Sequence, residues 1–335
     1  MRILAAAAAV LSLLGAGAAG LSDRLRSVAA AYYANAGKVE TQAGPDATMD
    51  YYQRLLDDAD LLNQSAPGSY PAQTWQSTVR AAAQLDLSLA TQLLAHSYEP
   101  MGAIRGLGET FVRASKDATM QPVAVYVPSS YSPERPAPLV VFLHGRLQAE
   151  SHLLAPAFIE DIAESTGTIV VAPYGRNAYD FRGAESDVYD ALDAAVKAFA
   201  IDPRRRYLAG YSMGGFSVFR LAPIHPNDWS AVMSIAGSLL ASRAPDAVSA
   251  LRHARFYVLT GARDDNVPTL YPTSTAIFLR DVGLPVTFYS QADGTHQLYS
   301  LRSILAQAWS DMERGVVRLP TGLTGSADLP EAVSQ

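Results

Sequence analysis

Apolar residues recur at helical spacing through the first hundred positions of the chain. The stretches from Leu21 to about Asn35, from Met49 to Gln64 and from about Ala72 to His96 carry this period, and each predicts an amphipathic helix. Ser22 is the expected N-cap of the first of them. The pattern therefore predicts a small helical region over residues 19–100.

Beyond residue 100, short apolar runs alternate with amphipathic segments, which predicts an α/β domain over residues 101–318. The run Leu139-Val140-Val141-Phe142-Leu143 is continuously apolar, as in a strand buried on both faces of a parallel sheet. Asp187 to Ala200 has the period of a helix between two strands. The active site of such a sheet is expected at the carboxyl ends of its strands. The predicted strands are Glu109–Ala114, Pro122–Val127, Pro138–His144, Thr168–Pro173, Arg206–Gly210, Ser230–Ala236, Arg255–Thr260 and Pro285–Ser290.

The two ends of the chain have patterns of their own. Met1-Arg2 precedes an apolar run from Ile3 to Leu14 and then small residues. That run is about 12 residues long, too short for a membrane-spanning helix, and it predicts a secretory signal peptide over residues 1–18 and a secreted or periplasmic protein. A buried N-terminal helix is the alternative. Residues 319–335 predict a loose tail.

Composition narrows the chemistry that the chain can perform. It has no cysteine, which excludes thiol nucleophiles, thiolate metal sites, disulfides and a lipid-modified N-terminal cysteine. The formal net charge of the 335 residues is −6, and no dense Lys/Arg stripe is present. This argues against nucleic acid or an anionic membrane surface as the main partner.

The strongest local signal is Gly210-Tyr211-Ser212-Met213-Gly214, which follows a predicted strand and opens a predicted helix. A G-x-S-x-G motif between a strand and a helix places its serine on a sharp turn above the sheet. The helix N-terminus behind the serine favours developing negative charge. We therefore expect Ser212 to be a nucleophile.

A serine hydroxyl needs a base, and the chain has six histidines. His296 lies just beyond the last predicted strand and before a helix, so we expect it to be the general base. His144 ends a strand in a His-Gly pair, where a positioning role is expected. The others have no accompanying motif, and structural or surface roles are the default for His96, His152, His225 and His253.

The remaining catalytic groups follow from the strand ends. Asp264 and Asp265 are adjacent after the strand Phe256-Tyr257-Val258-Leu259, and either can orient the histidine. The expected oxyanion donors are the backbone amide of Met213 and that of Arg146 or Leu147, in the turn after Gly145. A simple turn after a strand is the alternative reading of the His-Gly pair.

These residues resemble secreted esterases of the α/β-hydrolase superfamily, in particular the polyhydroxybutyrate-depolymerase and feruloyl-esterase-like group and the prolyl-oligopeptidase-like esterases. The order Ser212, Asp264, His296 is the order of that superfamily. The family's acid commonly stands in a G-x-x-D-x-x-V-P pattern, and Asp264 falls on its aspartate. The resemblance covers residues 107 to 310 and implies an α/β-hydrolase fold, a mostly parallel sheet flanked by helices. The helical region before residue 100 and the lack of cysteine depart from the pattern. The segments that carry it are Tyr126–Tyr131, Pro138–Gly145, Ala172–Arg176, Asp187–Asp190, Ile201–Arg204 and Gly210–Gly215.

The expected activity is hydrolysis of carboxylic esters through an acyl-enzyme, with no cofactor and no metal. A prolyl-oligopeptidase-like peptidase and a non-catalytic binding protein on a hydrolase scaffold are the alternatives. The helical region is interpreted as a lid, a docking module or packing for the sheet edge. Aromatic residues expected near the cleft, with packing or substrate binding as their role, are Tyr174, Tyr179, Phe181, Tyr211 and Phe216.

Overall fold

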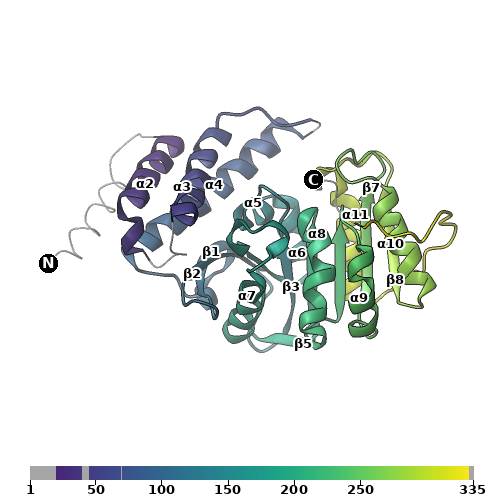
Figure 1. The fold of residues 1–335 in the computed structure, drawn as a ribbon. Helices are drawn as coiled ribbons and strands as arrows, with labels where there is room; N and C mark the ends of the chain where they lie inside the picture. The colour runs from purple at the N-terminus through teal and green to yellow at the C-terminus, as the bar shows by residue number, and fades with distance from the viewer. Residues whose placement is uncertain (1–19, 40–44, 69, 332–335) are drawn as a thin grey trace.

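The computed structural model describes residues 20–39, 45–68 and 70–331, and its centre is an eight-stranded sheet (Figure 1). The strand order is β1-β2-β4-β3-β5-β6-β7-β8. β1 and β2 pair antiparallel, as do β2 and β4. The remaining pairs, β4–β3, β3–β5, β5–β6, β6–β7 and β7–β8, are parallel. The strands are β1 (Gly106–Arg113), β2 (Met120–Val127), β3 (Ala137–Leu143), β4 (Ile169–Pro173), β5 (Ile201–Tyr211), β6 (Ala231–Ile235), β7 (Arg255–Gly261) and β8 (Val286–Gln291).

Helices cover both faces of this sheet, which confirms the predicted α/β-hydrolase fold class. The segment predicted as a signal peptide, residues 1–18, lies outside the described residues. Among the residues that the structure describes, no helix is both long and apolar enough to span a membrane. The helices are α2 (Leu21–Asn35), α3 (Pro45–Leu61), α4 (Ala72–Ala95), α5 (Glu150–Leu154), α6 (Ala157–Thr166), α7 (Glu185–Ala198), α8 (Met213–Leu221), α9 (Ala244–Ala250), α10 (Leu270–Asp281) and α11 (Arg302–Glu313).

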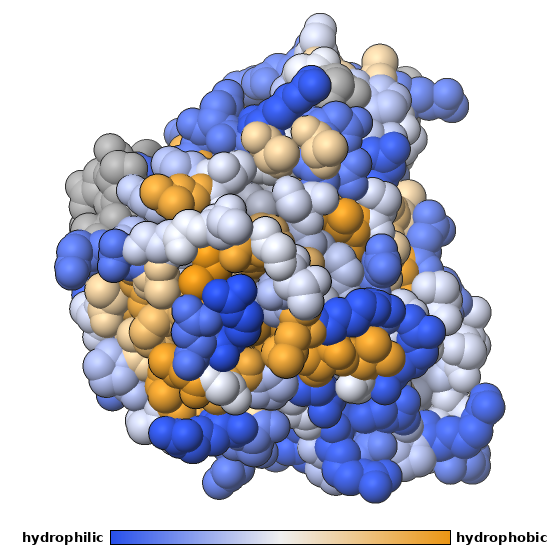
Figure 2. All heavy atoms as spheres, turned by 90° about the vertical axis from the view of Figure 1, so that its right-hand side faces the viewer, coloured by the Kyte–Doolittle hydropathy of each residue, from blue (hydrophilic) through white to orange (hydrophobic). Residues whose placement is uncertain are grey.

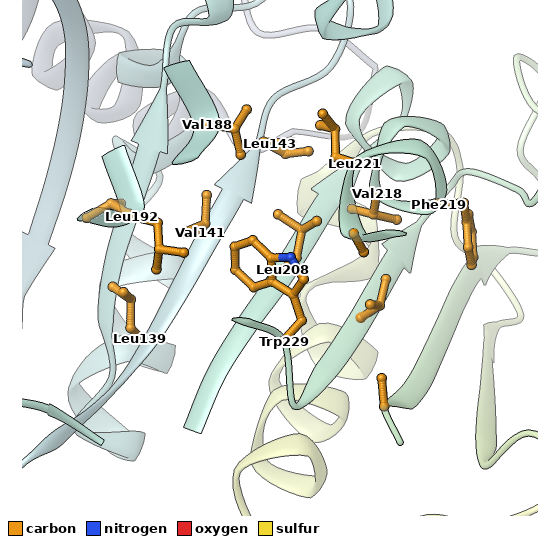
Figure 3. Close-up of a cluster of buried hydrophobic side chains, with 14 of the residues drawn as sticks. Leu139, Val141, Leu143, Val188, Leu192, Leu208, Val218, Phe219, Leu221 and Trp229 are labelled. Carbon is orange, nitrogen blue, oxygen red and sulfur yellow. The ribbon is translucent and has the colours of Figure 1, made fainter. Parts of the chain in front are cut away.

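Two hydrophobic clusters, one on each face, hold the helices to the sheet. Successive residues of a strand point to opposite faces, so Val141 of β3 packs in one cluster and Phe142 in the other. The first cluster joins β3 and β5 to α7 and α8, with Leu208 and Trp229 at its centre (Figure 3). The second cluster joins the opposite face to α5, α6 and α11 through residues such as Trp309. Burial of β3 on both faces explains its continuously apolar sequence.

The helices α2, α3 and α4 form a bundle beside the β1 end of the sheet (Figure 1). Leu25, Leu55 and Leu89 make its core, and Phe111 of β1 belongs to the same cluster. The prediction that Ser22 caps α2 is wrong, because the N-cap position is Gly20 and the Ser22 hydroxyl instead donates to the carbonyl of Ala59, at 3.0 Å. This hydroxyl therefore ties α2 to α3 rather than ending a helix.

The segment from residue 320 to residue 331 has no helix or strand, but it lies against the domain. Leu323 and Leu329 pack on the first hydrophobic cluster. The amide of Ala241 donates to the carbonyl of Pro330 at 3.0 Å, and the Ser274 hydroxyl donates to the carbonyl of Ser326 at the same distance. Residues 319–335 are predicted to form a loose tail. The described part of this segment instead packs on the α/β domain through partly buried apolar side chains.

The surface of the α/β domain mixes polar and apolar side chains. Figure 2 shows hydrophobic residues gathered in patches across one face, with hydrophilic side chains above and below them. Large hydrophobic side chains that are exposed include Leu147, at 86% exposure, and Tyr179, at 44%. Both belong to the candidate site described next.

Candidate active site

Ser212 lies on a sharp turn between β5 and α8. Its backbone has φ 52° and ψ −116°, outside the regions that a serine normally adopts. Glycine is required on both sides of the turn, because a Cβ on Gly210 would lie 2.2 Å from the carbonyl oxygen of Gly214. A Cβ on Gly214 would lie 2.4 Å from the carbonyl oxygen of Leu143. The two glycines thus let the turn close against β3 and present the serine at the end of the sheet.

His296 and Asp264 complete a chain of hydrogen bonds that begins at Ser212. Ser212 Oγ lies 2.9 Å from His296 Nε2. His296 Nδ1 lies 2.9 Å and 3.0 Å from the two carboxylate oxygens of Asp264, so Nδ1 carries a proton and Nε2 is free to accept the serine proton. The amides of Asn266 and Val267 donate to Asp264 at 3.0 and 2.8 Å and fix its orientation.

The three residues come from the carboxyl ends of three strands, β5, β7 and β8. The structure places Asp264, not Asp265, against His296, and the side chain of Asp264 is fully buried. Tyr211, next to the serine, donates from its hydroxyl to the carbonyl of His296 at 2.6 Å. The tyrosine therefore anchors the backbone of the histidine that faces Ser212.

His144 lies under the turn that follows β3. Its ring nitrogens are each 2.8 Å from a carbonyl oxygen, one of Gly145 and one of Tyr174. Burial lowers the pKa of His144, although the two carbonyls act in the opposite direction. Its own carbonyl accepts from the amide of Gly214 at 3.1 Å. His144 thus joins the β3 turn, the β4 turn and the serine turn through hydrogen bonds.

A cavity with a volume of about 640 Å³ is lined by Ser212. Met213, Arg146 and Leu147, the expected sources of oxyanion donors, all line it. Leu147 has a left-handed backbone (φ 59°), so the turn after β3 holds a conformation that costs energy for a leucine. Such strain is concentrated at functional sites.

The walls of this cavity are partly apolar. Phe216, Leu240 and Val267 form a small cluster on one side, with Tyr271 packed behind them. Of the five aromatic residues expected near the cleft, the cavity lining includes Tyr179, Tyr211 and Phe216. Phe181 is instead fully buried in the core, and the Tyr174 ring lies beneath the guanidinium of Arg54, 5.1 Å from its centroid.

A second cavity of about 320 Å³ lies between the helical bundle and the α/β domain. The bundle side contributes Tyr70 and Trp75, and the domain side contributes Phe158 and Tyr299. Tyr70 stacks on Tyr299 with ring centroids 4.2 Å apart. This cavity shares Leu147, Gln148 and Tyr211 with the cavity over the serine, so the helical region reaches the edge of the candidate site.

Sequence reasoning missed a buried ionic cluster between the bundle and the sheet. Arg54 of α3 forms ion pairs with Asp86 of α4, Glu109 of β1 and Glu150 of α5. All three acidic side chains have no exposed surface. Next to them, His152 Nε2 lies 2.7 Å from the carboxylate of Asp58.

The carboxylates of this cluster could also ligate a cation, because the oxygens of Asp86, Glu109 and Glu150 lie within 4.8 Å of one another. The guanidinium of Arg54 already supplies positive charge at that point. Burial raises the pKa of both Asp86 and Glu109, while Arg54 acts to lower it. The cluster is therefore a buried connection between the helical region and the α/β domain. No local motif marks it, because its members come from four separate elements.

Comparison with known proteins identifies the fold. A chain described as a thermostable esterase superposes with a TM-score of 0.51 and 20% identity, over 63% of each chain. The ferulic acid esterase AmCE1/Fae1A of Anaeromyces mucronatus superposes with a TM-score of 0.51 and 14% identity, over 62% of this chain and 89% of that one. The chain has the α/β-hydrolase fold. Residues 118–281 match the model of the Esterase family.

A curated relative points the same way. The bifunctional acetylxylan esterase/xylanase XynS20E of Neocallimastix patriciarum is 33% identical over 102 residues, which are 29% of this chain. This chain covers only 15% of that protein, so the likeness concerns one segment. The helical bundle and the tail lie outside the segment that matches the Esterase family.

Proposed function

We propose that the protein hydrolyses carboxylic esters through an acyl-enzyme formed on Ser212. The observation that carries the proposal is the hydrogen-bonded chain from Ser212 through His296 to Asp264, at the floor of a cavity. His296 takes the serine proton as Ser212 Oγ attacks the ester carbonyl, and then gives that proton to the leaving alcohol. A water molecule then attacks the acyl-enzyme carbonyl while His296 takes its proton. His296 returns this proton to Ser212 Oγ, and the carboxylic acid and free Ser212 are released.

Asp264 holds the imidazole of His296 in the tautomer that accepts at Nε2 and stabilises the imidazolium that forms. Two backbone amides donate hydrogen bonds to the oxyanion of the tetrahedral intermediate. One is the amide of Met213, and the other is that of Arg146 or Leu147 in the turn after β3. Every group in this sequence comes from the chain itself. The names of the relatives include acetylxylan and ferulic acid esterases, so acetylated and feruloylated sugars are the first natural esters to assay.

We also propose that the protein is exported, on the signal-peptide pattern of residues 1–18. Expression of the full chain in a secreting bacterial host, followed by mass determination of the extracellular protein, tests this. A mature form that starts near residue 19 supports export, and an intact chain retained inside the cell contradicts it.

The enzymatic proposal is tested with 4-nitrophenyl esters from acetate to long acyl chains. We expect hydrolysis that Ser212→Ala abolishes. Asp264→Asn lowers kcat by roughly 10⁴-fold because the wrong imidazole tautomer is held. Asp265→Asn is the matched control and keeps kcat within a few-fold. Cleavage of aminoacyl-arylamides without cleavage of any ester would favour a peptidase instead.

A further inference from the structure

The cavity over Ser212 is lined by three arginines, although the chain as a whole is acidic. Arg146, Arg182 and Arg243 all line it, against the carboxylates of Asp180 and Glu331. The lining thus has one more positive than negative side chain, whereas the chain has a formal net charge of −6. A cleft with an excess of one sign attracts ligands of the opposite sign.

Arginines from three separate segments surround one buried carboxylate, that of Asp180, in the loop between β4 and α7. Asp180 is 3% exposed and forms ion pairs with Arg182, Arg220 and Arg243. Glu185 neutralises only Arg220, at 2.6 Å. Arg182 is held at 3.4 Å from Asp180 while its side chain stays 69% exposed. One positive charge of this group therefore has no carboxylate of its own.

Arg146 is the clearest unpaired cation at the site. It directly follows Gly145 in the turn after β3, and its side chain is exposed at the cavity. Within the described parts of the chain it forms no ion pair, and its guanidinium lies over the ring of Tyr179, 5.9 Å from the ring centroid. That contact positions the guanidinium across the β4–α7 loop without neutralising it.

We propose that Arg146, supported by Arg182, binds a negatively charged substituent of the ester, and that the enzyme therefore prefers esters that carry a carboxylate near the scissile bond. The inference rests on the proposed function, since it assigns a substrate class to the same site. Arginine suits this task because its planar guanidinium pairs with a carboxylate in two parallel hydrogen bonds. The apolar cluster of Phe216, Leu240 and Val267 then contacts the uncharged part of the substrate.

Matched substrate pairs test the proposal. The first pair is the 4-nitrophenyl monoester of adipic acid against 4-nitrophenyl hexanoate, which differ in a terminal carboxylate at the same chain length. The second pair is 4-acetoxybenzoate against phenyl acetate, which places the charge on the alcohol side. The quantity compared is the ratio of kcat/KM for the anionic ester to kcat/KM for the neutral ester. A substitution of Arg146 that also disturbs the oxyanion donors slows both esters alike, so that effect cancels in the ratio.

We expect a ratio well above one for at least one pair in the wild type. Arg146→Gln lowers that ratio roughly tenfold, which corresponds to about 1.4 kcal/mol, and Arg146→Lys retains most of it. High salt lowers the wild-type ratio, because the cation is exposed. Arg204→Gln is the control, since Arg204 is 90% exposed near the start of β5, at the opposite end of the strand from Ser212. Ratios that Arg146→Gln leaves unchanged for both pairs overturn the proposal.

A binding measurement separates this inference from the proposed function. Ser212→Ala is titrated with the adipate monoester and with hexanoate ester by calorimetry, alone and combined with Arg146→Gln. Tighter binding of the anionic ester that disappears with Arg146→Gln supports the anion site even if the wild type hydrolyses no ester. Equal affinity for the two esters, in an enzyme that hydrolyses neutral esters, overturns the anion site and leaves the proposed function standing.

Discussion

Removing Arg54 from the buried ionic cluster tests how the helical region is held to the catalytic domain. The guanidinium is 6% exposed and is shared by Asp86, Glu109 and Glu150. Arg54→Leu retains the aliphatic part of the side chain but removes the guanidinium, which leaves the three carboxylates without their cation. Loss of one partner from a buried ion pair costs about 3–5 kcal/mol, against a total stability of roughly 5–15 kcal/mol. We therefore expect a large fall in the free energy of unfolding at pH 8.

The destabilisation should depend on pH, with a sign that follows from the carboxyl groups. Burial raises the pKa of Glu109 and Asp86 in the folded state, and Arg54 opposes the rise. A folded-state pKa above the unfolded value makes stability fall as pH rises through the window between the two. Without Arg54 the folded pKa values rise further, so the loss caused by Arg54→Leu is largest at high pH and shrinks as these carboxyls become protonated.

The assay is urea unfolding followed by tryptophan fluorescence at pH 5 and pH 8. Arg26→Leu is the matched control, because the Arg26–Asp60 pair is 45% and 58% exposed, and exposed pairs contribute under about 1 kcal/mol. If Arg54→Leu does not fold at pH 8, recovery of folding at pH 5 gives the same answer. Two results would contradict this role of Arg54. One is a free energy of unfolding of Arg54→Leu within about 1 kcal/mol of the wild type at pH 8, and the other is an equal fall in that free energy at both pH values.

Four further changes probe other parts of the structure. Tyr211→Phe removes a hydrogen bond to the His296 carbonyl and should lower kcat by roughly three- to tenfold; an unchanged kcat would mean that the tyrosine does not position the base. Gly214→Ala places a Cβ 2.4 Å from backbone, so circular dichroism and ester assays should reveal a misfolded or inactive protein. Trp75→Ala opens the second cavity and should alter the ranking of ester substrates, whereas an identical ranking would leave the helical region without a role at the site. Burial raises the pKa of Glu313 to about 7, so wild-type stability falls as pH rises from the ordinary glutamate range to 7, and Glu313→Gln should flatten that slope in urea unfolding.

The sequence predicted those parts of the fold whose cause is local. Buried parallel strands such as β3 are apolar throughout, and the glycines around Ser212 are required by contacts within one turn. The boundaries were less accurate where pairing, rather than side-chain pattern, sets them. β5 begins at Ile201 instead of Arg206, because Ile201 pairs with Ala137 across a register shift in β3.

The parts that the sequence could not predict depend on contacts between distant segments. Arg54 and Glu150 are ordinary charged residues on helices, and only the packing of the bundle on the sheet brings them together. The choice between Asp264 and Asp265 could not be made from spacing alone, because either side chain can follow the strand. The resemblance favoured Asp264, and the structure places that carboxylate at 2.9 Å from His296.

The most direct test of Ser212 as the nucleophile is to find the residue that a serine-reactive reagent modifies covalently. The protein is incubated with a serine-reactive phosphonate, digested, and analysed by mass spectrometry, with unfolded protein as the control for activation by the fold. We expect one adduct, on the peptide that contains Ser212, which is absent from Ser212→Ala and from the unfolded chain and forms in step with the loss of ester hydrolysis. An adduct on another residue, or ester hydrolysis that persists in Ser212→Ala, would contradict it.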